Sequence, residues 1–194
     1  GCNKGGDLIA FVQEMHGLSF IEAVEDLSDR ANIPLPKDFR GSDEETPEAD
    51  KKRAAQRDKT LTSYKVNRFA AKFFRDQLKK QKHINEYFKS RSVTDELSLN
   101  FYLGAAPASW DSLASFFAES KAPMPLAAEL GLIKPSQKSQ KPGGPGYFDL
   151  FRNRAMFPIL DLKGKVVGFG GRGLPLPAGA PDVGDGTPKY LNSN

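Results

Sequence analysis

The sequence predicts an α+β protein with a small helical unit, a polar linker and a larger unit that mixes helices with a β-hairpin. Apolar residues recur at helical spacing in residues 8–15 and again in residues 66–78. Two apolar segments, residues 156–161 and 165–170, are joined by a three-residue connection that ends in Gly164. That combination is typical of a β-hairpin and gives the larger unit its β content.

Residues 1–36 are expected to form two helices. Asp7 precedes the first apolar repeat, where its carboxylate can accept a free backbone N–H, and Gly17 suits the end of that helix. Ser19 and Glu22 have the spacing of a capping box at the start of the second helix. Two prolines after this helix stop it.

Residues 37–60 have the composition of a linker, because they are polar and carry hardly an apolar side chain. An acidic run, residues 43–48, precedes a basic run, residues 51–59. These runs are either solvated faces or the charged lead-in to a helix. We expect two separately packed units joined by a mobile linker.

A long helix is expected from about Leu61, with Phe73 and Phe74 on its buried face. Both phenylalanines are therefore assigned to the core rather than to stacking on a ligand. The shorter elements expected after it are helices at 83–91, 94–99, 109–117 and 126–133, a strand at 101–104, and a surface loop at 136–146.

The hairpin ends at Gly170-Gly171-Arg172, where the missing Cβ atoms let the backbone come close to a ligand. A segment rich in proline and glycine then returns to residues 188–192. The basic side chains around this rigid apolar element are Arg152, Arg154, Arg172 and Lys189, with Tyr190 beside the last of them. The residues alone thus indicate a basic, glycine-lined surface, whose glycines serve either the packing of the fold or the binding of a ligand.

Composition excludes several classes of protein. The 194 residues, 39% apolar and 27% charged, are globular rather than disordered in composition, and no apolar run approaches the roughly 20 residues of a membrane span. The single cysteine excludes an intramolecular disulfide framework and is compatible with the cytosol, where we expect the protein. The net charge of +4 favours a polyanionic partner only if the positive side chains are clustered.

Three sequence words occur in one order: YFDLFRNRAMFPILD, GKVVGFGGR and TPKYLNS. Together they resemble the N-terminal part of the RNA polymerase domain of bacterial-type DNA primases, the DnaG family. Tyr87, Arg91 and the turn at 103–107 before Trp110 also resemble that family. The family usually has glycine after the arginine, where this chain has Ser92, so the local turn geometry is not carried over from the resemblance.

The start of the chain, GCNKGGDLIAFVQEMHGLSFIEAVEDL, resembles the segment that follows the last zinc-binding cysteine of the same family. By this resemblance Cys2 is the last of four zinc ligands, and residues 1–36 are the helical remnant of a zinc-ribbon domain. The alternative is that Cys2 is an ordinary thiol, because one cysteine cannot hold a structural zinc, which needs about four ligands. His16 has no partner at metal spacing and is interpreted as a surface residue.

The resemblance implies an enzyme that synthesises short RNA primers on single-stranded DNA for replication. A basic groove must then hold the template and the RNA–DNA hybrid through their phosphates. The groove positions that the resemblance implies are Arg91, Arg152, Arg154, Arg172, Lys189 and Tyr190. The alternative for Arg152 and Arg154 is pairing with Asp149 or Asp161.

Primer synthesis also requires carboxylates that hold magnesium or manganese at the reacting groups. In the family these acidic residues lie in a TOPRIM fold that follows the last word, so we expect a fragment without a catalytic centre. Asp161, Asp182 and Asp185 are interpreted as turn residues. The expected organisation is 1–36, part of the zinc-binding domain; 37–60, linker; and 61–194, the N-terminal subdomain of the polymerase domain. The implied partners are single-stranded DNA, RNA–DNA hybrid, ribonucleotides and a replicative helicase.

Two other functions use the same residues. A single-stranded-DNA-binding module without polymerase activity would need only the basic surface. A nucleotide-binding loop at GFGGRG would need a helix directly after the glycines, whereas Pro175 and Pro177 follow. The second alternative is therefore disfavoured.

Overall fold

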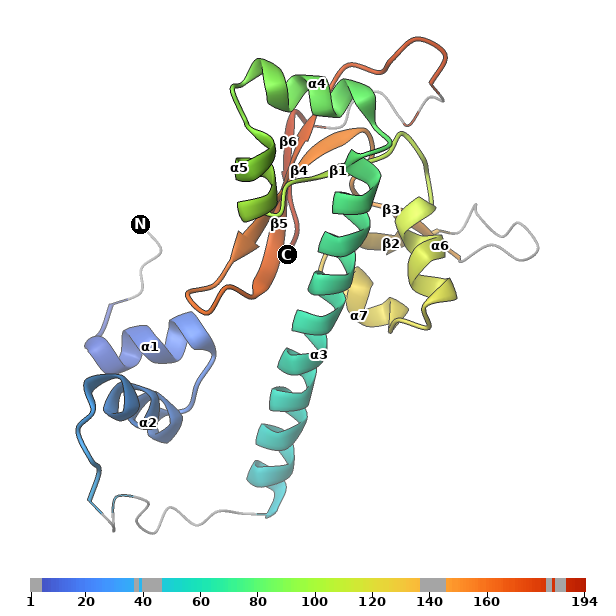
Figure 1. Ribbon diagram of the computed structural model, residues 1–194. Helices are drawn as coiled ribbons and strands as arrows, with labels where there is room; N and C mark the ends of the chain where they lie inside the picture. Colours follow the sequence, from blue (N-terminus) through green and yellow to red (C-terminus); the bar gives the residue numbers. More distant parts are fainter. Residues whose placement is uncertain (1–4, 37–38, 40–46, 137–145, 181–182, 184–187) are drawn as a thin grey trace. The chain divides into compact units, whose positions relative to one another are not determined.

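The computed structural model describes residues 5–36, 39, 47–136, 146–180, 183 and 188–194. It divides into two compact units, residues 1–54 and 55–194, which we describe separately. The first unit is helical and the second combines helices with small antiparallel sheets, so the α+β prediction is confirmed (Figure 1). None of the described helices is both long enough and apolar enough to cross a membrane.

The first unit contains α1 (Leu8–His16) and α2 (Phe20–Ala31). The Asp7 carboxylate accepts the Ala10 N–H at 2.8 Å, and Gly17 ends α1 with a φ of 63°. Ser19 and Glu22 form both hydrogen bonds of the capping box at the start of α2. The three predicted caps are confirmed, because each depends on residues that are neighbours in the sequence.

Helix α3 (Pro47–Leu78) begins well before the predicted start at Leu61. Residues 47–60 are therefore helical, so the interpretation of the basic run 51–59 as the lead-in to a helix is confirmed, and the linker does not extend over residues 47–60. Alanine, lysine, glutamate, glutamine and arginine dominate this segment, and all five are strong helix formers. The polarity of this segment means that the helix buries no face there, and residues 54–60 are indeed exposed. Residues 37, 38 and 40–46 of the predicted linker lie outside the described residues.

Four shorter helices follow: α4 (Lys82–Ser90), α5 (Asp95–Asn100), α6 (Ser112–Glu119) and α7 (Met124–Glu129). Thr94 caps α5 as expected, accepting the Leu97 N–H at 3.2 Å. The predicted strand at 101–104 is wrong, because the chain turns at Tyr102 with a φ of 51° and the strand begins at Gly104. The predicted helix at 126–133 ends four residues early, since Ile133 belongs to a strand.

The main sheet is antiparallel with the order β1 (Gly104–Ala106), β4 (Arg154–Leu160), β5 (Val166–Gly173) and β6 (Tyr190–Asn192). The predicted hairpin is β4–β5, with an irregularity in register between Ile159 and Leu160. A second sheet pairs β2 (Ile133–Pro135) with β3 (Tyr147–Asp149). Strands β2, β3 and β6 have three residues each, too few to show a period in the sequence.

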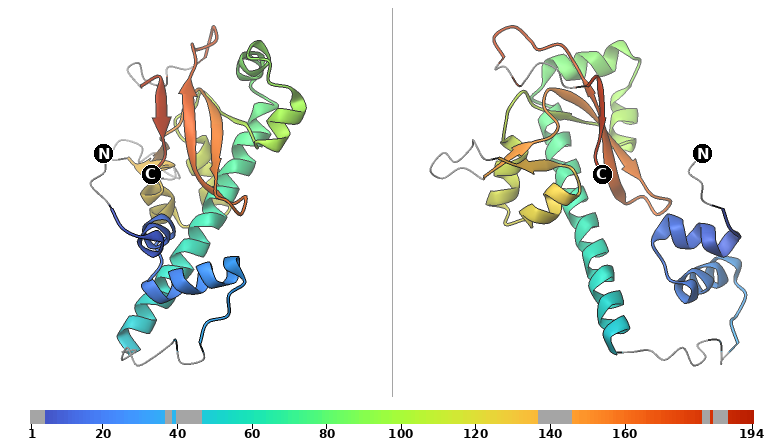
Figure 2. Two further views of the ribbon diagram at one scale, coloured as in Figure 1. Left: turned by 90° about the vertical axis from the view of Figure 1, so that its left-hand side faces the viewer. Right: turned by 180° about the vertical axis from the view of Figure 1, so that it is seen from behind.

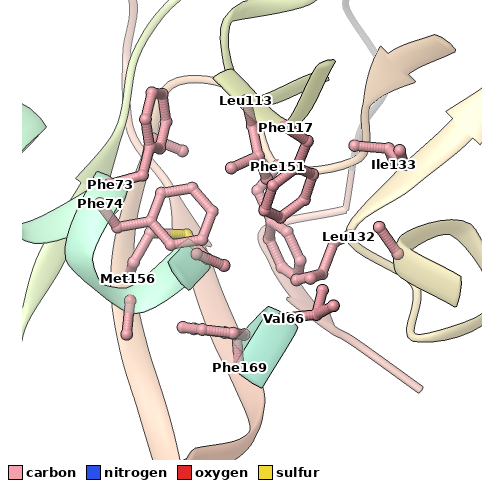
Figure 3. Close-up of a cluster of buried hydrophobic side chains, with 14 of the residues drawn as sticks. Val66, Phe73, Phe74, Leu113, Phe117, Leu132, Ile133, Phe151, Met156 and Phe169 are labelled. Carbon is pink, nitrogen blue, oxygen red and sulfur yellow. The ribbon is translucent and has the colours of Figure 1, made fainter. Parts of the chain in front are cut away.

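The C-terminal half of α3 lies along one face of the main sheet, as Figures 1 and 2 show, and supplies the core there. Phe74 is 1% exposed and lies edge-on to Phe169 of β5, with ring centres 5.4 Å apart. Met156 of β4 and Phe151 complete this contact (Figure 3). The prediction that Phe73 and Phe74 are core residues is confirmed.

A second, smaller cluster lies on the opposite face of the sheet. There Ile84 and Phe88 of α4 pack with Ala105 of β1 and Ala155 of β4. These two alanines are cross-strand partners, and such partners point to the same face of a sheet. Helix α4 therefore covers only the end of this face near Ala155, and Phe157 and Ile159 further along β4 are 37% and 48% exposed.

Candidate nucleic-acid interface

Strand register places a row of three residues on the sheet face that α4 partly covers. Arg172 of β5 lies opposite Ala155 of β4 on one side and opposite Tyr190 of β6 on the other. Cross-strand partners share a face, so Arg172 and Tyr190 project together beside a small side chain. We call this set the Arg172 row.

Next to the Arg172 row the sheet presents glycine. Gly170 lies between Phe157 and Asn192, and a Cβ placed on it would meet nothing closer than the Asn192 Oδ1 at 3.5 Å. Gly171 faces the other way, and a Cβ there would lie 2.6 Å from the Cδ1 of Phe151. The two interpretations of the glycines thus apply to different residues: Gly171 is required by packing, whereas Gly170 leaves open space on the surface.

Tyr87 of α4 holds the Arg172 side chain from above the sheet. The Arg172 guanidinium donates to the Tyr87 hydroxyl, and its carbon lies 4.7 Å from the centre of the Tyr87 ring. The same carbon lies 5.8 Å from the centre of the Tyr190 ring. The Nε of Arg172 is buried and has no hydrogen-bond partner among the described residues. Arg172 is therefore fixed between two aromatic rings.

Two further predicted residues lie at the same place. The Arg91 guanidinium is 5.7 Å from the centre of the Tyr87 ring, and the Lys189 ammonium is 5.9 Å from the centre of the Tyr190 ring. Both side chains are exposed, and Tyr190 is 64% exposed. The structure thus brings together four of the six predicted groove residues: Arg91, Arg172, Lys189 and Tyr190.

Arg154 does not belong to this surface, which corrects its predicted role as a phosphate ligand. It is 1% exposed, because neighbouring residues of a strand alternate between faces and Arg154 points to the face opposite Arg172. Its guanidinium donates to the carbonyl oxygens of Gly171 at 3.1 Å, Pro188 at 2.8 Å and Lys189 at 3.5 Å. Burial, and then the charge of Arg152, lower its pKa. Arg154 attaches β6 to β5.

Arg152 lies in a separate aromatic contact. Its guanidinium carbon is 4.5 Å from the centre of the Trp110 ring and 5.8 Å from that of Phe148. Its Nε donates to the Val183 carbonyl at 2.9 Å, and its NH1 group donates to the carbonyl of Asp149. Burial lowers its pKa. No described contact joins Arg152 to the Arg172 row.

The alternative pairing with Asp149 or Asp161 holds for Arg152 only in part: it contacts Asp149 through the backbone carbonyl and feels the charge of its carboxylate. The Asp149 carboxylate accepts the backbone N–H groups of Leu113 at 2.8 Å and Ala114 at 2.9 Å, and so caps α6 from 35 residues away. Asp161 accepts two N–H groups within its own turn, from Lys163 and Lys165, as expected of a turn residue. Neither carboxylate forms an ion pair with Arg152 or Arg154 among the described residues.

Metal ligands were tested in the same way. Nowhere in the described part of the chain do three or more His, Cys, Asp or Glu side chains gather as a metal site. Cys2, Asp182 and Asp185 lie outside the described residues. The described residues therefore do not fit a catalytic metal.

Comparison with known proteins decides the family. A family model described as the N-terminal domain of the DNA primase catalytic core matches residues 73–194, and a CHC2 zinc finger model matches residues 1–43. The chain belongs to the DnaG primase family. The predicted resemblance is confirmed over both units.

Curated primases are similar along the whole chain. The DNA primase of Halalkalibacterium halodurans is 36% identical over 100% of this chain, and that of Pseudomonas aeruginosa is 34% identical over 100%. The chain spans 28% of the length of the first of these primases and 26% of the second.

Solved primase structures share the fold. The Aquifex aeolicus primase, comprising zinc-binding and RNA polymerase domains, is 30% identical with a TM-score of 0.57, and the match covers 100% of this chain and 40% of that one. A DnaG primase catalytic domain bound to single-stranded DNA is 29% identical with a TM-score of 0.56, covering 70% of this chain and 40% of that one.

The sequence predicted Tyr87 in a helix and gave it no site role, whereas in this structure its hydroxyl and ring hold the Arg172 side chain. A signal was available, since Tyr87 and Arg91 are four residues apart and so lie on one helical face. Trp110 was named only as a family position, and its contact with Arg152 depends on the tertiary structure. Asn153, which links β4 to α4 through His83 Nε2 at 2.7 Å, gave no signal.

Proposed function

We propose that this chain supplies the template- and hybrid-binding surface of a DNA primase that synthesises short RNA primers on single-stranded DNA. The observation that carries the proposal is the Arg172 row, where an arginine held between two tyrosines projects beside a glycine surface. Membership of the DnaG primase family supports it.

The side chains of the Arg172 row have the chemistry to bind single-stranded DNA. Arg172, Arg91 and Lys189 make no ion pair among the described residues, so their charge is available to phosphates. The exposed ring of Tyr190 offers a stacking platform, worth roughly 1–3 kcal/mol per base in other proteins. A related DnaG catalytic domain has been solved bound to single-stranded DNA.

Arg152 has a different part in this proposal. Its guanidinium is stacked and half-buried against Trp110, which is 46% exposed. We assign Arg152 to the support of the Trp110 ring, on which its guanidinium lies. Arg154 supports the surface indirectly by holding the strand that carries Lys189 and Tyr190.

The whole primase would supply what the described residues lack. We propose that residues 1–36 belong to a zinc-binding domain in which Cys2 is one of four ligands, as the zinc finger match supports. Magnesium or manganese would stabilise the charge of the transferring phosphate at carboxylates elsewhere in the protein. Ribonucleotides and the replicative helicase would be partners of that larger assembly.

A salt series of single-stranded DNA binding tests the proposal. We expect Arg172→Ala and Lys189→Ala each to weaken binding and to lower the slope of log K against log salt by about 0.7, with the melting temperature nearly unchanged. Lys134→Ala, an exposed lysine of β2, is the matched control and should bind like the parent. Parent-like affinity of both test variants at every salt concentration would place the interface elsewhere.

A primer-synthesis assay tests the division of labour. The chain alone, with template, ribonucleotides and magnesium, should make no RNA and should bind no stoichiometric zinc. The whole primase should make primers, and Arg172→Ala in it should raise the template concentration needed for half-maximal rate. Template-dependent RNA from the chain alone would contradict the proposal, as would one zinc per monomer of the chain.

A further inference from the structure

A second basic groove lies on the other side of the main sheet, between α3 and the β4–β5 turn. Its cavity of about 630 Å³ is lined by one stripe of α3, by Tyr102 and by residues 164–166 of the turn. We call it the α3 groove. Helix α3 packs on the sheet face opposite the Arg172 row, so the two surfaces are separate.

Five cations and no carboxylate occur among the described residues that line the α3 groove, and Asp161 lies beside it, bonded to Tyr64 and to the Lys165 N–H. The α3 stripe contributes Lys65, Arg68, Lys72 and Arg75, and the turn contributes Lys165. None of the five forms an ion pair among the described residues. Helical neighbours three or four residues apart are separated by about 4.5–6 Å along the axis, so the stripe is a ladder of charges of the kind that follows a phosphate backbone.

Two tyrosines give this groove an aromatic wall as well as charge. The Lys165 ammonium lies 4.6 Å from the centre of the Tyr64 ring, and the Tyr64 hydroxyl donates to Asp161. These two contacts of Tyr64 fix the β4–β5 turn against α3. Tyr102 is 45% exposed, and the Arg75 guanidinium lies 6.0 Å from its ring centre. An exposed ring beside clustered cations is the arrangement by which proteins bind single strands without reading their sequence.

Most of the ladder lies outside both family models. The zinc finger match ends at residue 43 and the catalytic-core match begins at residue 73, so Lys65, Arg68 and Lys72 belong to neither. A solvated helix face would explain lysines at these positions. It does not explain a cavity of ligand size that is walled by two tyrosines and a second element of the fold.

We propose that the α3 groove is a second binding site for single-stranded nucleic acid, which holds a few nucleotides by their phosphates and stacks a base on Tyr102. The phosphates follow the α3 ladder, and Lys165 closes the groove from the turn. The α3 groove binds a part of the single-stranded nucleic acid that the Arg172 row does not bind.

Counting bound hexathymidylate on the 194-residue chain tests the site. We expect two hexamers per parent chain, and one for Arg68→Glu/Lys72→Glu. Arg172→Ala should also bind one, at the α3 groove. The control Lys121→Glu/Lys134→Glu makes the same change in net charge at exposed positions and should keep both. If charge reversal lowers the melting temperature, Arg68→Gln/Lys72→Gln replaces it with the same expected stoichiometry.

Photo-crosslinking identifies where each hexamer lies. A hexamer carrying 5-iodouracil should crosslink to Tyr102 as well as to Tyr190, and Tyr102→Leu should remove only the first crosslink. Parent-like stoichiometry in the charge-reversal variant, or crosslinks at Tyr190 alone, would overturn the second site and leave the Arg172 row intact. Displacement of the groove hexamer by ATP at concentrations that leave Tyr190 crosslinked would also overturn it and assign the groove to free nucleotides.

Discussion

The guanidinium of Arg172 donates to the hydroxyl of Tyr87, a residue 85 positions earlier, and lies 4.7 Å from the centre of its ring. This contact joins the end of β5 to α4. It orients an arginine whose cross-strand neighbours are an alanine and an exposed tyrosine. The tyrosine thus positions the arginine in the proposed interface.

Substitution of Tyr87 should affect binding more than folding. Tyr87→Phe removes the hydroxyl that accepts from Arg172 and keeps the ring, so we expect affinity for single-stranded DNA to fall by about threefold to tenfold, the effect of one hydrogen bond of about 1 kcal/mol. Tyr87→Leu removes the ring as well and should weaken binding further. Fluorescence anisotropy with a labelled oligonucleotide measures both. An unchanged affinity in Tyr87→Phe would show that Arg172 does not depend on this contact.

Two neighbouring glycines should respond in opposite ways to alanine. Gly171→Ala places a Cβ 2.6 Å from the Cδ1 of Phe151, so we expect the free energy of unfolding to fall by about 1–3 kcal/mol. Gly170→Ala has its nearest neighbour at 3.5 Å and should leave stability almost unchanged. The new methyl would stand beside the Arg172 row and should weaken DNA binding. Urea unfolding and anisotropy compare the two variants, and equal loss of stability would contradict the assigned faces.

Arg154 should contribute to stability through the backbone of β6. Arg154→Met leaves the carbonyls of Gly171, Pro188 and Lys189 without their donor, so we expect the free energy of unfolding to fall by about 2–4 kcal/mol. Arg154→Lys keeps the charge but not the fork of donors and should recover little of the loss. Arg91→Ala, at an exposed position, is the control, with an expected change within about 0.5 kcal/mol.

DNA binding distinguishes the two roles of Arg154. If it only holds β6 in place, stabilising osmolytes should restore binding to Arg154→Met. Persistent loss of affinity in a fully folded Arg154→Met sample would instead support direct contact with phosphate.

Asp149 should make stability depend on pH. Burial raises its pKa from 3.8 to about 7, although the N–H groups of Leu113 and Ala114 and the hydroxyl of Ser112 oppose the shift. The folded state therefore binds this proton more tightly than the unfolded state. Between about pH 4 and pH 7 unfolding releases the proton, so stability falls as pH rises, with a limiting slope of about −1.4 kcal/mol per pH unit.

Urea unfolding from pH 4 to pH 8 measures this slope. Asp149→Asn carries no titrating proton and should show a flatter profile, while Asp95→Asn, at an exposed carboxylate, should follow the parent. A parent whose stability rises through this window, or an Asp149→Asn profile as steep as the parent's, would contradict the assignment.

The sequence by itself determined the elements whose signals are local. The caps at Asp7, Ser19 and Thr94 depend on residues within three positions, and the β4–β5 hairpin depends on two apolar segments and the turn between them. The burial of Phe73 and Phe74 followed from helical spacing. The resemblance to the family was evident from three sequence motifs, YFDLFRNRAMFPILD, GKVVGFGGR and TPKYLNS, which are specific when they occur in this order.

Only the tertiary structure decided which basic residues share a surface. Arg154 and Arg172 look equivalent in the sequence, yet the register of β4 against β5 turns one into the protein and the other onto the open face. Tyr87 lies at the site because α4 packs on that face of the sheet. The polar start of α3 is helical although it has no buried face, so its sequence lacks the apolar periodicity by which helices are predicted. The physical reason is that a side chain's face depends on pairing with strands and helices that are distant in the chain, and one residue of register reverses it.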